Sequence, residues 1–211
     1  PSDLNGKKLG APGFDAGRRA FPIFAKANSV SGVQWTSMDP PLRETMLVRG
    51  DIDAITGFSF TSLLNLEARG VKVEDIVVLP YAAHGVKLYG NVIIVSPRLL
   101  KDNPAAVKAF LVAFARGAKE VMANPDAAID YVKARDGIIN VDLEKRRLRM
   151  AIDSVVASAD ARAEGFGQVV PGRLALMASQ VSDAFGTKTR VDPAAVWTDA
   201  VLPSKADLNI L

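Results

Sequence analysis

The sequence predicts an α/β protein in two parts, the first built on a parallel sheet and the second mostly helical. In the first 81 residues, short apolar runs of strand length alternate with segments of helix length, as they do in βαβ units. From Pro97 onward the apolar residues follow helical spacing. Residues 80–90 show no clear periodicity. We therefore expect a boundary in that segment and domains at residues 1–85 and 86–211.

Local signals predict the elements of the first part. Short apolar runs predict strands at residues 7–11, 33–38, 52–56 and 76–79, with one more at 92–96. The first helix is expected at residues 18–28. Asp39 before two prolines predicts the start of a second helix. Ser59 or Thr61 is expected to cap a third.

The second part is predicted from caps and from helical spacing. Asn103 and Asn124 each precede a proline, which places an N-cap before Pro at the first helical position. After Asn103 the apolar residues recur at i, i+3, i+4 and i+7, which predicts a buried stripe of Val107, Phe110, Leu111, Phe114 and Ala118. Further helices are expected at about residues 142–161, from Pro171 to Gly186, and after Asp192.

Composition and charge exclude several classes of function. The chain has 211 residues and no cysteine, which excludes disulfides, thiolate metal sites and thiol catalysis. Its net charge of +3 is small and scattered, so we expect no nucleic-acid-binding surface. No apolar run reaches the roughly 18 residues of a membrane-spanning helix. The first residues do not resemble a signal peptide.

Patterns typical of catalysis or metal binding are also absent from the sequence. It contains one histidine, His84, and neither a His-Glu-x-x-His metal pattern nor a Gly-x-Ser-x-Gly nucleophile elbow. The turn at residues 13–17 lacks the lysine of a phosphate-binding loop. We therefore interpret His84 as a hinge or surface residue and expect no metal, no cofactor and no catalytic residue.

Two strand-to-helix turns are the candidate binding elements. Residues 13–17 follow the first predicted strand, and residues 56–61 follow the third. Such turns leave backbone N–H groups free at a helix N-terminus, where an anion can bind. They fit ordinary capped helix starts equally well. Asp15 would repel an anion, so it is either a cap or a partner for a donor or cationic group on a ligand.

Several segments resemble the ABC-transporter substrate-binding proteins, in the branch that takes nitrate, sulfonates, taurine and thiamine-pyrimidine precursors. They are residues 3–10 (DLNGKKLG), 47–54 (LVRGDIDA), 103–110 (NPAAVKAF) followed by Arg116 and Gly117, and 124–128 (NPDAA). Each segment alone is weakly specific, but their order and spacing together match this branch along most of the chain.

The resemblance implies a type II periplasmic-binding-protein fold, in which two lobes joined by a hinge close on a small solute. It implies the solute-binding component of an ABC importer, with a small-molecule solute and a transporter permease as partners and with no catalysis. Residues 1–85 would then form the second lobe, and residues 86–211 the hinge return and the C-terminal helical part of the first lobe. The implied location is periplasmic, or lipid-anchored and extracellular in a Gram-positive cell.

The resemblance also assigns residues to a binding site. The family's contacts map to Gly13, Phe14, Asp15, Gly17 and Arg18 after the first strand, and to Gly57, Phe58 and Ser59 after the third. Tyr81, His84 and Tyr89 fall in the hinge and cleft region. Family members often carry small hydroxyl residues where this chain has Phe-Asp-Ala. We therefore expect a small polar or anionic solute and favour an aromatic, nitrogen-bearing one over a sulfonate.

Two other functions share this fold and stay open at the level of sequence. One is an enzyme similar to those of thiamine-pyrimidine synthesis, which would need His84 in the cleft and, in the family, a cysteine-rich metal motif that this chain lacks. The other is a cytoplasmic effector-binding domain of a transcription regulator, which would need a helix-turn-helix ahead of Pro1.

Overall fold

The computed structural model describes the whole chain, residues 1–211, which forms two compact units. Unit 1 contains Pro1–Leu88 and Ala175–Asp192, and unit 2 contains Tyr89–Leu174 and Pro193–Leu211. The domains expected from the sequence, 1–85 and 86–211, differ from these units mainly in residues 175–192, which pack with the N-terminal part. No helix combines the length and the hydropathy that crossing a membrane demands.

Unit 1 is built on a three-stranded parallel sheet. Its strands are β1 (Lys8–Gly10), β2 (Gln34–Thr36) and β3 (Ala54–Ile55), in the order β2-β1-β3. In this register Leu9 lies opposite Trp35 on one side and Ala54 on the other. Because the strands are parallel, the three loops that follow them lie at one edge of the sheet, which we call the carboxyl edge.

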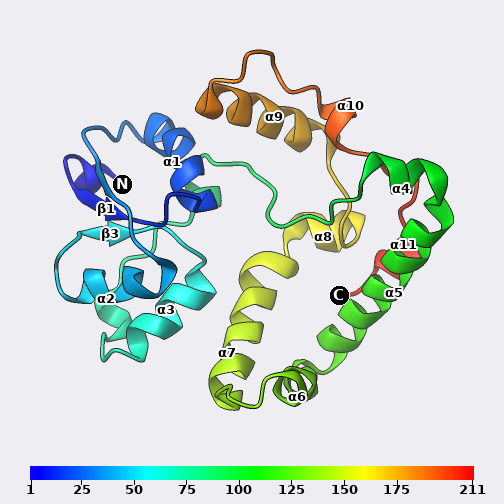
Figure 1. Ribbon diagram of the computed structural model, residues 1–211, viewed down its shortest axis with the longest axis horizontal. Coiled ribbons are helices and arrows are strands. Elements are labelled where there is room, and N and C mark those ends of the chain that lie inside the picture. The colour runs from blue at the N-terminus through cyan, green and yellow to red at the C-terminus, as the bar shows by residue number, and fades with distance from the viewer. The chain divides into compact units, whose positions relative to one another are not determined.

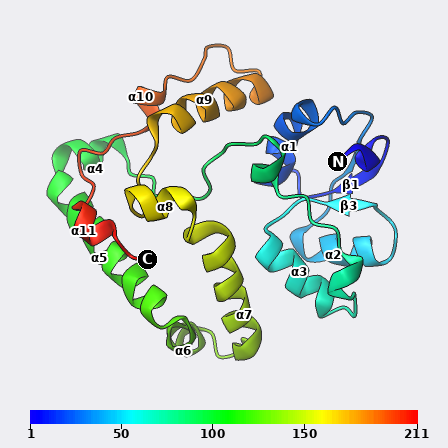
Figure 2. The same cartoon turned by 180° about the vertical axis from the view of Figure 1, so that it is seen from behind.

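Helices cover both faces of this sheet. They are α1 (Ala16–Ala27), α2 (Arg43–Val48) and α3 (Ser59–Glu67), with single 3₁₀ turns at Ser2–Leu4, Pro40–Leu42, Val73–Asp75 and Tyr81–His84. α1 lies on one face, and α2 and α3 lie on the other (Figures 1 and 2). The core cluster includes Leu9, Phe21, Phe24, Val30 and Val86, with Phe24 only 1% exposed. Burial of these large apolar side chains stabilises unit 1.

Unit 2 is helical, as the spacing after Pro97 predicts. Its helices are α4 (Pro97–Asp102), α5 (Pro104–Ala123), α6 (Pro125–Arg135), α7 (Val141–Ala151), α8 (Ala159–Glu164), α10 (Pro193–Val196) and α11 (Lys205–Leu208). α9 (Pro171–Phe185) begins in unit 2 and continues in unit 1. The single helix expected at residues 142–161 is interrupted by a π-helical turn, Ile152–Val156, after which Ser158 caps α8.

The helix caps separate correct predictions from wrong ones. Asn103 accepts a hydrogen bond from the Ala106 N–H and Asn124 from the Ala127 N–H, as predicted. The predicted cap at Ser59 or Thr61 is wrong, because Phe58 occupies the N-cap position of α3 and makes no side-chain cap. Ser59 instead begins the helix. A hydroxyl residue one position past the cap cannot accept from the first turn in the usual way.

Two expected strands do not form. Residues 76–79 and 92–96 belong to no sheet, and their apolar side chains are exposed, by 83% for Val77 and 87% for Ile94. A strand needs a neighbouring strand that exchanges backbone hydrogen bonds with it. No strand of the chain pairs with these segments. The apolar runs therefore indicate a preference for strand structure, but a strand forms only where a neighbouring strand is present to pair with it.

The apolar stripe of α5 is only partly buried, which corrects the prediction of a core. Val107 is 7% exposed and Ala115 is 2% exposed, whereas Phe110 is 56% and Phe114 is 47% exposed. The rings of Phe110 and Phe114 stack on one another with centroids 6.2 Å apart, and Phe166 extends the stack at 6.3 Å. Helical spacing identified the apolar face correctly, but no layer of unit 2 covers all of it.

Candidate functional site

The predicted binding turns meet at the carboxyl edge of the unit 1 sheet. The first turn follows β1 and the second follows β3, and these strands are neighbours. The Thr56 hydroxyl joins the two turns by donating a 2.7 Å hydrogen bond to Oδ1 of Asp15. Sequence reasoning found both turns, but the bond between them depends on the strand order.

Asp15 is the N-cap of α1. Its Oδ1 accepts from the Arg18 N–H at 2.8 Å as well as from Thr56. The carboxylate thus occupies a first-turn donor that an anionic ligand would use, and its charge already complements the helix dipole. Gly17 allows this arrangement, since a Cβ there would lie 3.0 Å from Oδ1 of Asp15 and 3.0 Å from Cβ of Thr56.

A buried ion pair lies directly behind Asp15. Arg43, the first residue of α2, donates from Nε (3.1 Å) and Nη2 (2.8 Å) to Oε1 of Glu44. Ser62 of α3 accepts from Nη2 of Arg43 at 3.1 Å and donates to Glu44 at 2.8 Å. Nη1 of Arg43 lies 3.8 Å from Oδ2 of Asp15. Arg43 is 9% exposed and Glu44 2%.

The ionised state of Glu44 is favoured despite its burial. Burial is the largest single influence and would raise the pKa of Glu44. Hydrogen bonds from Arg43 and Ser62, together with the charge of Arg43, outweigh it and hold the pKa of Glu44 below its ordinary value. The pair therefore forms a fixed ionic support for the carboxyl edge.

Gly57 fits closely over this support. A Cβ at Gly57 would lie 2.8 Å from Nη1 of Arg43 and 2.9 Å from Oγ of Ser62. Any side chain there would displace the guanidinium group, so the position of Arg43 requires a glycine at residue 57.

Two aromatic side chains stand at the same edge. Phe14 is 72% exposed and Phe58 is 51% exposed. The ring of Phe58 stacks on Phe60, with centroids 5.2 Å apart. Exposed aromatic rings beside buried polar groups are typical of ligand sites.

Arg18 is held within the protein. Its Nη1 donates to Oγ of Ser37 at 2.7 Å and to the Ala11 carbonyl at 3.4 Å. The guanidinium carbon lies 4.9 Å from the centre of the Trp35 ring. Trp35 also packs edge-on against Phe21, at 5.3 Å. Arg18 thus links the loops after β1 and β2 through its side chain.

The residues predicted for the hinge and cleft make contacts inside their own units. The Tyr81 hydroxyl donates to the Gly17 carbonyl at 2.8 Å, and burial followed by the Asp15 charge raises the pKa of Tyr81, so this donor stays protonated. His84 packs edge-on against Phe24 at 5.6 Å. In unit 2 the Tyr89 hydroxyl accepts from the Val170 N–H at 2.9 Å.

Sequence reasoning missed three residues that support the site, namely Arg43, Glu44 and Ser62. Arg43 and Glu44 follow two prolines at the start of a short helix, where charged residues are usually exposed. Thr56 was part of the second candidate turn, residues 56–61, but its hydrogen bond to Asp15 was not predicted.

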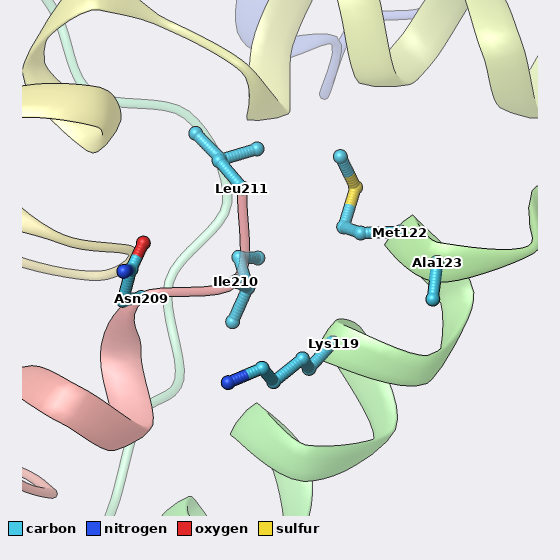
Figure 3. A pocket seen from close by; sticks show the side chains of 6 residues that line it. All are labelled: Lys119, Met122, Ala123, Asn209, Ile210 and Leu211. Atoms are coloured by element: carbon cyan, nitrogen blue, oxygen red, sulfur yellow. The ribbon is translucent and has the colours of Figure 1, made fainter.

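Unit 2 has a groove of its own, between α5 and the segment after α11. Its volume is about 420 Å³, and it is lined by Lys119, Met122, Ala123, Asn209, Ile210 and Leu211 (Figure 3). Lys119 and Met122 project from α5 toward the C-terminal segment. None of the predicted binding residues lines this groove.

Comparison with solved structures confirms the fold. The chain matches the structure described as the periplasmic sulfonate-binding protein SsuA of a sulfonate ABC transporter from Methylobacillus flagellatus KT, with a TM-score of 0.62 and 17% identity over 94% of this chain and 59% of that one. At this identity the likeness shows the fold, which is the expected type II periplasmic-binding-protein class with a parallel sheet and many helices.

Two sequence comparisons agree with this fold. The chain is 30% identical over 131 residues to a protein named riboflavin-binding protein RibY from Chloroflexus aurantiacus, an alignment that covers 61% of this chain and 36% of that protein. The chain thus spans little more than a third of that relative. The model of the family described as NMT1/THI5 like matches residues 1–128, which include unit 1 up to Leu88 and every predicted binding residue. This chain belongs to the NMT1/THI5-like family.

Proposed function

We propose that the protein is the solute-binding component of an ABC importer and that the carboxyl edge of unit 1 contacts the solute. The observation that carries this proposal is the pairing of exposed Phe14 and Phe58 with the polar groups of Asp15 and Arg43. Open α/β sheets bind ligands at the carboxyl ends of their strands. The two named relatives, a riboflavin-binding protein and a sulfonate-binding protein of a transporter, support the same function.

The proposed solute is an aromatic, nitrogen-bearing molecule. Phe14 and Phe58 offer aromatic surfaces for a planar ring. Asp15 offers a carboxylate to N–H donors, and it opposes a sulfonate at the start of α1 because it already occupies the Arg18 N–H. The name of the riboflavin-binding relative supports a planar heterocycle.

The proposal includes no chemistry on the solute. An enzyme of this fold would use His84, which packs against Phe24, nine residues along the chain from Asp15. Nine residues of α-helix span about 13 Å. His84 thus lies against the C-terminal part of α1, where its carbonyl also accepts from Nδ2 of Asn28, and away from the carboxyl edge where Asp15 begins that helix. The regulatory alternative receives no support from any contact at the site.

The proposed partner of the loaded protein is the permease of the importer. We also propose export to the periplasm, or anchoring by a lipid on the outer face of a Gram-positive cell. Both follow from the function and from the location named for the sulfonate-binding structure.

A thermal-shift screen of the complete gene product tests this function. The panel contains riboflavin, uracil, amino acids, aromatic acids and taurine. A ligand that binds only the folded state raises the melting temperature by mass action, equivalent to about 2.7 kcal/mol at a hundredfold excess over Kd. We expect the aromatic nitrogenous solutes to raise it and taurine to leave it unchanged. The function is wrong if no solute of any class shifts the melting temperature.

A further inference from the structure

Two atoms at the carboxyl edge of unit 1 are left without a hydrogen bond inside the protein. Arg43 uses Nε and Nη2 for Glu44 and Ser62, while no hydrogen bond uses Nη1. Asp15 uses Oδ1 for Arg18 and Thr56, while no hydrogen bond uses Oδ2. Nη1 and Oδ2 lie 3.8 Å apart. They form one donor and one acceptor side by side.

Both atoms are reachable from solvent. Neither Nη1 of Arg43 nor Oδ2 of Asp15 is a fully buried side-chain polar atom that lacks a hydrogen-bond partner. Since neither atom makes a hydrogen bond within the chain, each must retain some contact with solvent. Arg43 is nonetheless 91% buried, so its free nitrogen is held in place by the packing around the rest of the side chain.

The charges around this pair disfavour a simple anion. The guanidinium group of Arg43 already faces two carboxylates, those of Glu44 and Asp15. A sulfonate or phosphate placed on Nη1 would also face Oδ2 of Asp15, and like charges that close repel. A neutral group that accepts from Nη1 and donates to Oδ2 satisfies both atoms.

A cyclic amide or imide supplies that group, because its ring carries a carbonyl next to an N–H. Hydrogen bonds of about 2.9 Å from two neighbouring ring positions can reach protein atoms 3.8 Å apart. Phe14 and Phe58, both exposed at this edge, can pack on the faces of such a ring. The glycine at residue 57 places no side chain against Nη1.

We propose that Nη1 of Arg43 and Oδ2 of Asp15 together recognise the adjacent carbonyl and N–H of a planar cyclic amide or imide, and so determine which solutes this protein accepts. The proposal rests on the solute-binding function. It names Arg43, which the sequence did not indicate, as a specificity-determining residue. A site built to bond an N–H rejects the analogue without it, because the carboxylate oxygen is then left unpaired.

The test uses two pairs of probes on the complete gene product. Riboflavin and uracil carry an N3–H flanked by carbonyls, and in N3-methylriboflavin and 3-methyluracil a methyl group replaces this hydrogen. The N3–H and its carbonyls belong to a three-ring system in riboflavin and to a single ring in uracil. The two pairs therefore show which size of ring system the site accepts. Dissociation constants are measured by calorimetry for each probe.

Asp15→Asn is the informative variant. The Asn side-chain oxygen can still accept from the Arg18 N–H and from Thr56, which preserves the cap of α1. Its NH₂ group replaces Oδ2 and can no longer accept from the ligand N–H. Asp51→Asn is the matched control, since it makes the same change at an exposed aspartate of the same unit, whose partner is Arg49.

We expect a parent probe to bind about tenfold to a hundredfold more tightly than its N-methyl analogue, the range for hydrogen bonds to charged groups. In Asp15→Asn this ratio should fall close to one, and in Asp51→Asn it should stay unchanged. Equal binding of parent and methyl probes, or an unchanged ratio in Asp15→Asn, overturns the inference and leaves the function standing. Stabilisation by taurine or amino acids alone would likewise overturn the inference and leave the function standing. If no solute of any class binds, both the inference and the function are wrong.

Discussion

Unit 1 and unit 2 carry the same kind of amphipathic helix but use it differently. In α1 the apolar face meets the sheet, and Phe24 is 1% exposed. In α5 the apolar face carries Phe110 and Phe114, which are 56% and 47% exposed. The difference shows that helical spacing identifies an apolar face, whereas its burial depends on a second layer to pack against.

Charged residues show the same contrast. The Arg43–Glu44 pair of unit 1 has side chains 11% and 2% exposed, and hydrogen bonds fill its surroundings. The Arg149–Asp126 pair of unit 2 has side chains 63% and 40% exposed. Substitutions at matched positions in the two units should therefore differ in their effect on the free energy of unfolding.

The largest difference is expected for phenylalanine. Phe24→Ala removes a fully buried ring and should lower the free energy of unfolding by about 3–5 kcal/mol. Phe114→Ala, at a half-exposed ring, should lower it by less than about 1 kcal/mol. Urea unfolding followed by circular dichroism measures both. Equal losses would mean that unit 2 buries its apolar face as well as unit 1 does.

The next difference concerns the ion pairs. Glu44→Ala leaves the Arg43 guanidinium buried without its main partner, which should cost about 3–5 kcal/mol. Asp126→Ala breaks an exposed pair and should cost at most about 1 kcal/mol. A Glu44→Ala loss as small as that of Asp126→Ala would show that the buried pair contributes no more than the exposed one.

The pH dependence of the free energy of unfolding tests the charge of Glu44 in the same pair. The pKa of Glu44 in the folded state lies below its ordinary value of 4.5. The ionised carboxylate thus contributes stability that is complete above about pH 4.5 and is lost as the pH falls through the lower folded-state pKa. Glu44→Gln should flatten the wild-type stability curve below pH 4.5, and an unchanged curve in this variant would show that Glu44 does not cause the loss of stability.

The smallest difference is expected for two glycines, and it changes sign. Gly57→Ala brings a Cβ within 2.8 Å of Nη1 of Arg43 and should destabilise unit 1 by about 1–3 kcal/mol. Gly117→Ala, in the exposed interior of α5 with nothing within 4 Å, should stabilise the helix by up to about 1 kcal/mol. Thermal unfolding followed by circular dichroism measures the stability change in both variants. A neutral Gly57→Ala would show that Arg43 can move.

Local signals predicted the features that depend on a few adjacent residues. Asn103 and Asn124 marked two helix starts, because a cap involves only its own first turn. Residues 92–96 failed as a strand because pairing depends on a distant segment. The same distinction applies to the site. Asp15 and Gly57 stood out in their turns, whereas Arg43 became part of the site only through contacts with α3 and the loop after β1.

The two oxygens of Asp15 differ in their contacts, since Oδ1 caps α1 and Oδ2, the oxygen that we propose for the solute, makes no hydrogen bond within the chain. A library that randomises this position to alter the solute would therefore select mainly for chains that still fold. Replacement by alanine would lose the cap, at about 0.5–2 kcal/mol, together with any contact to the solute. Asparagine keeps the cap, so engineering of specificity should fix residue 15 as Asp or Asn and vary the exposed rings of Phe14 and Phe58 instead.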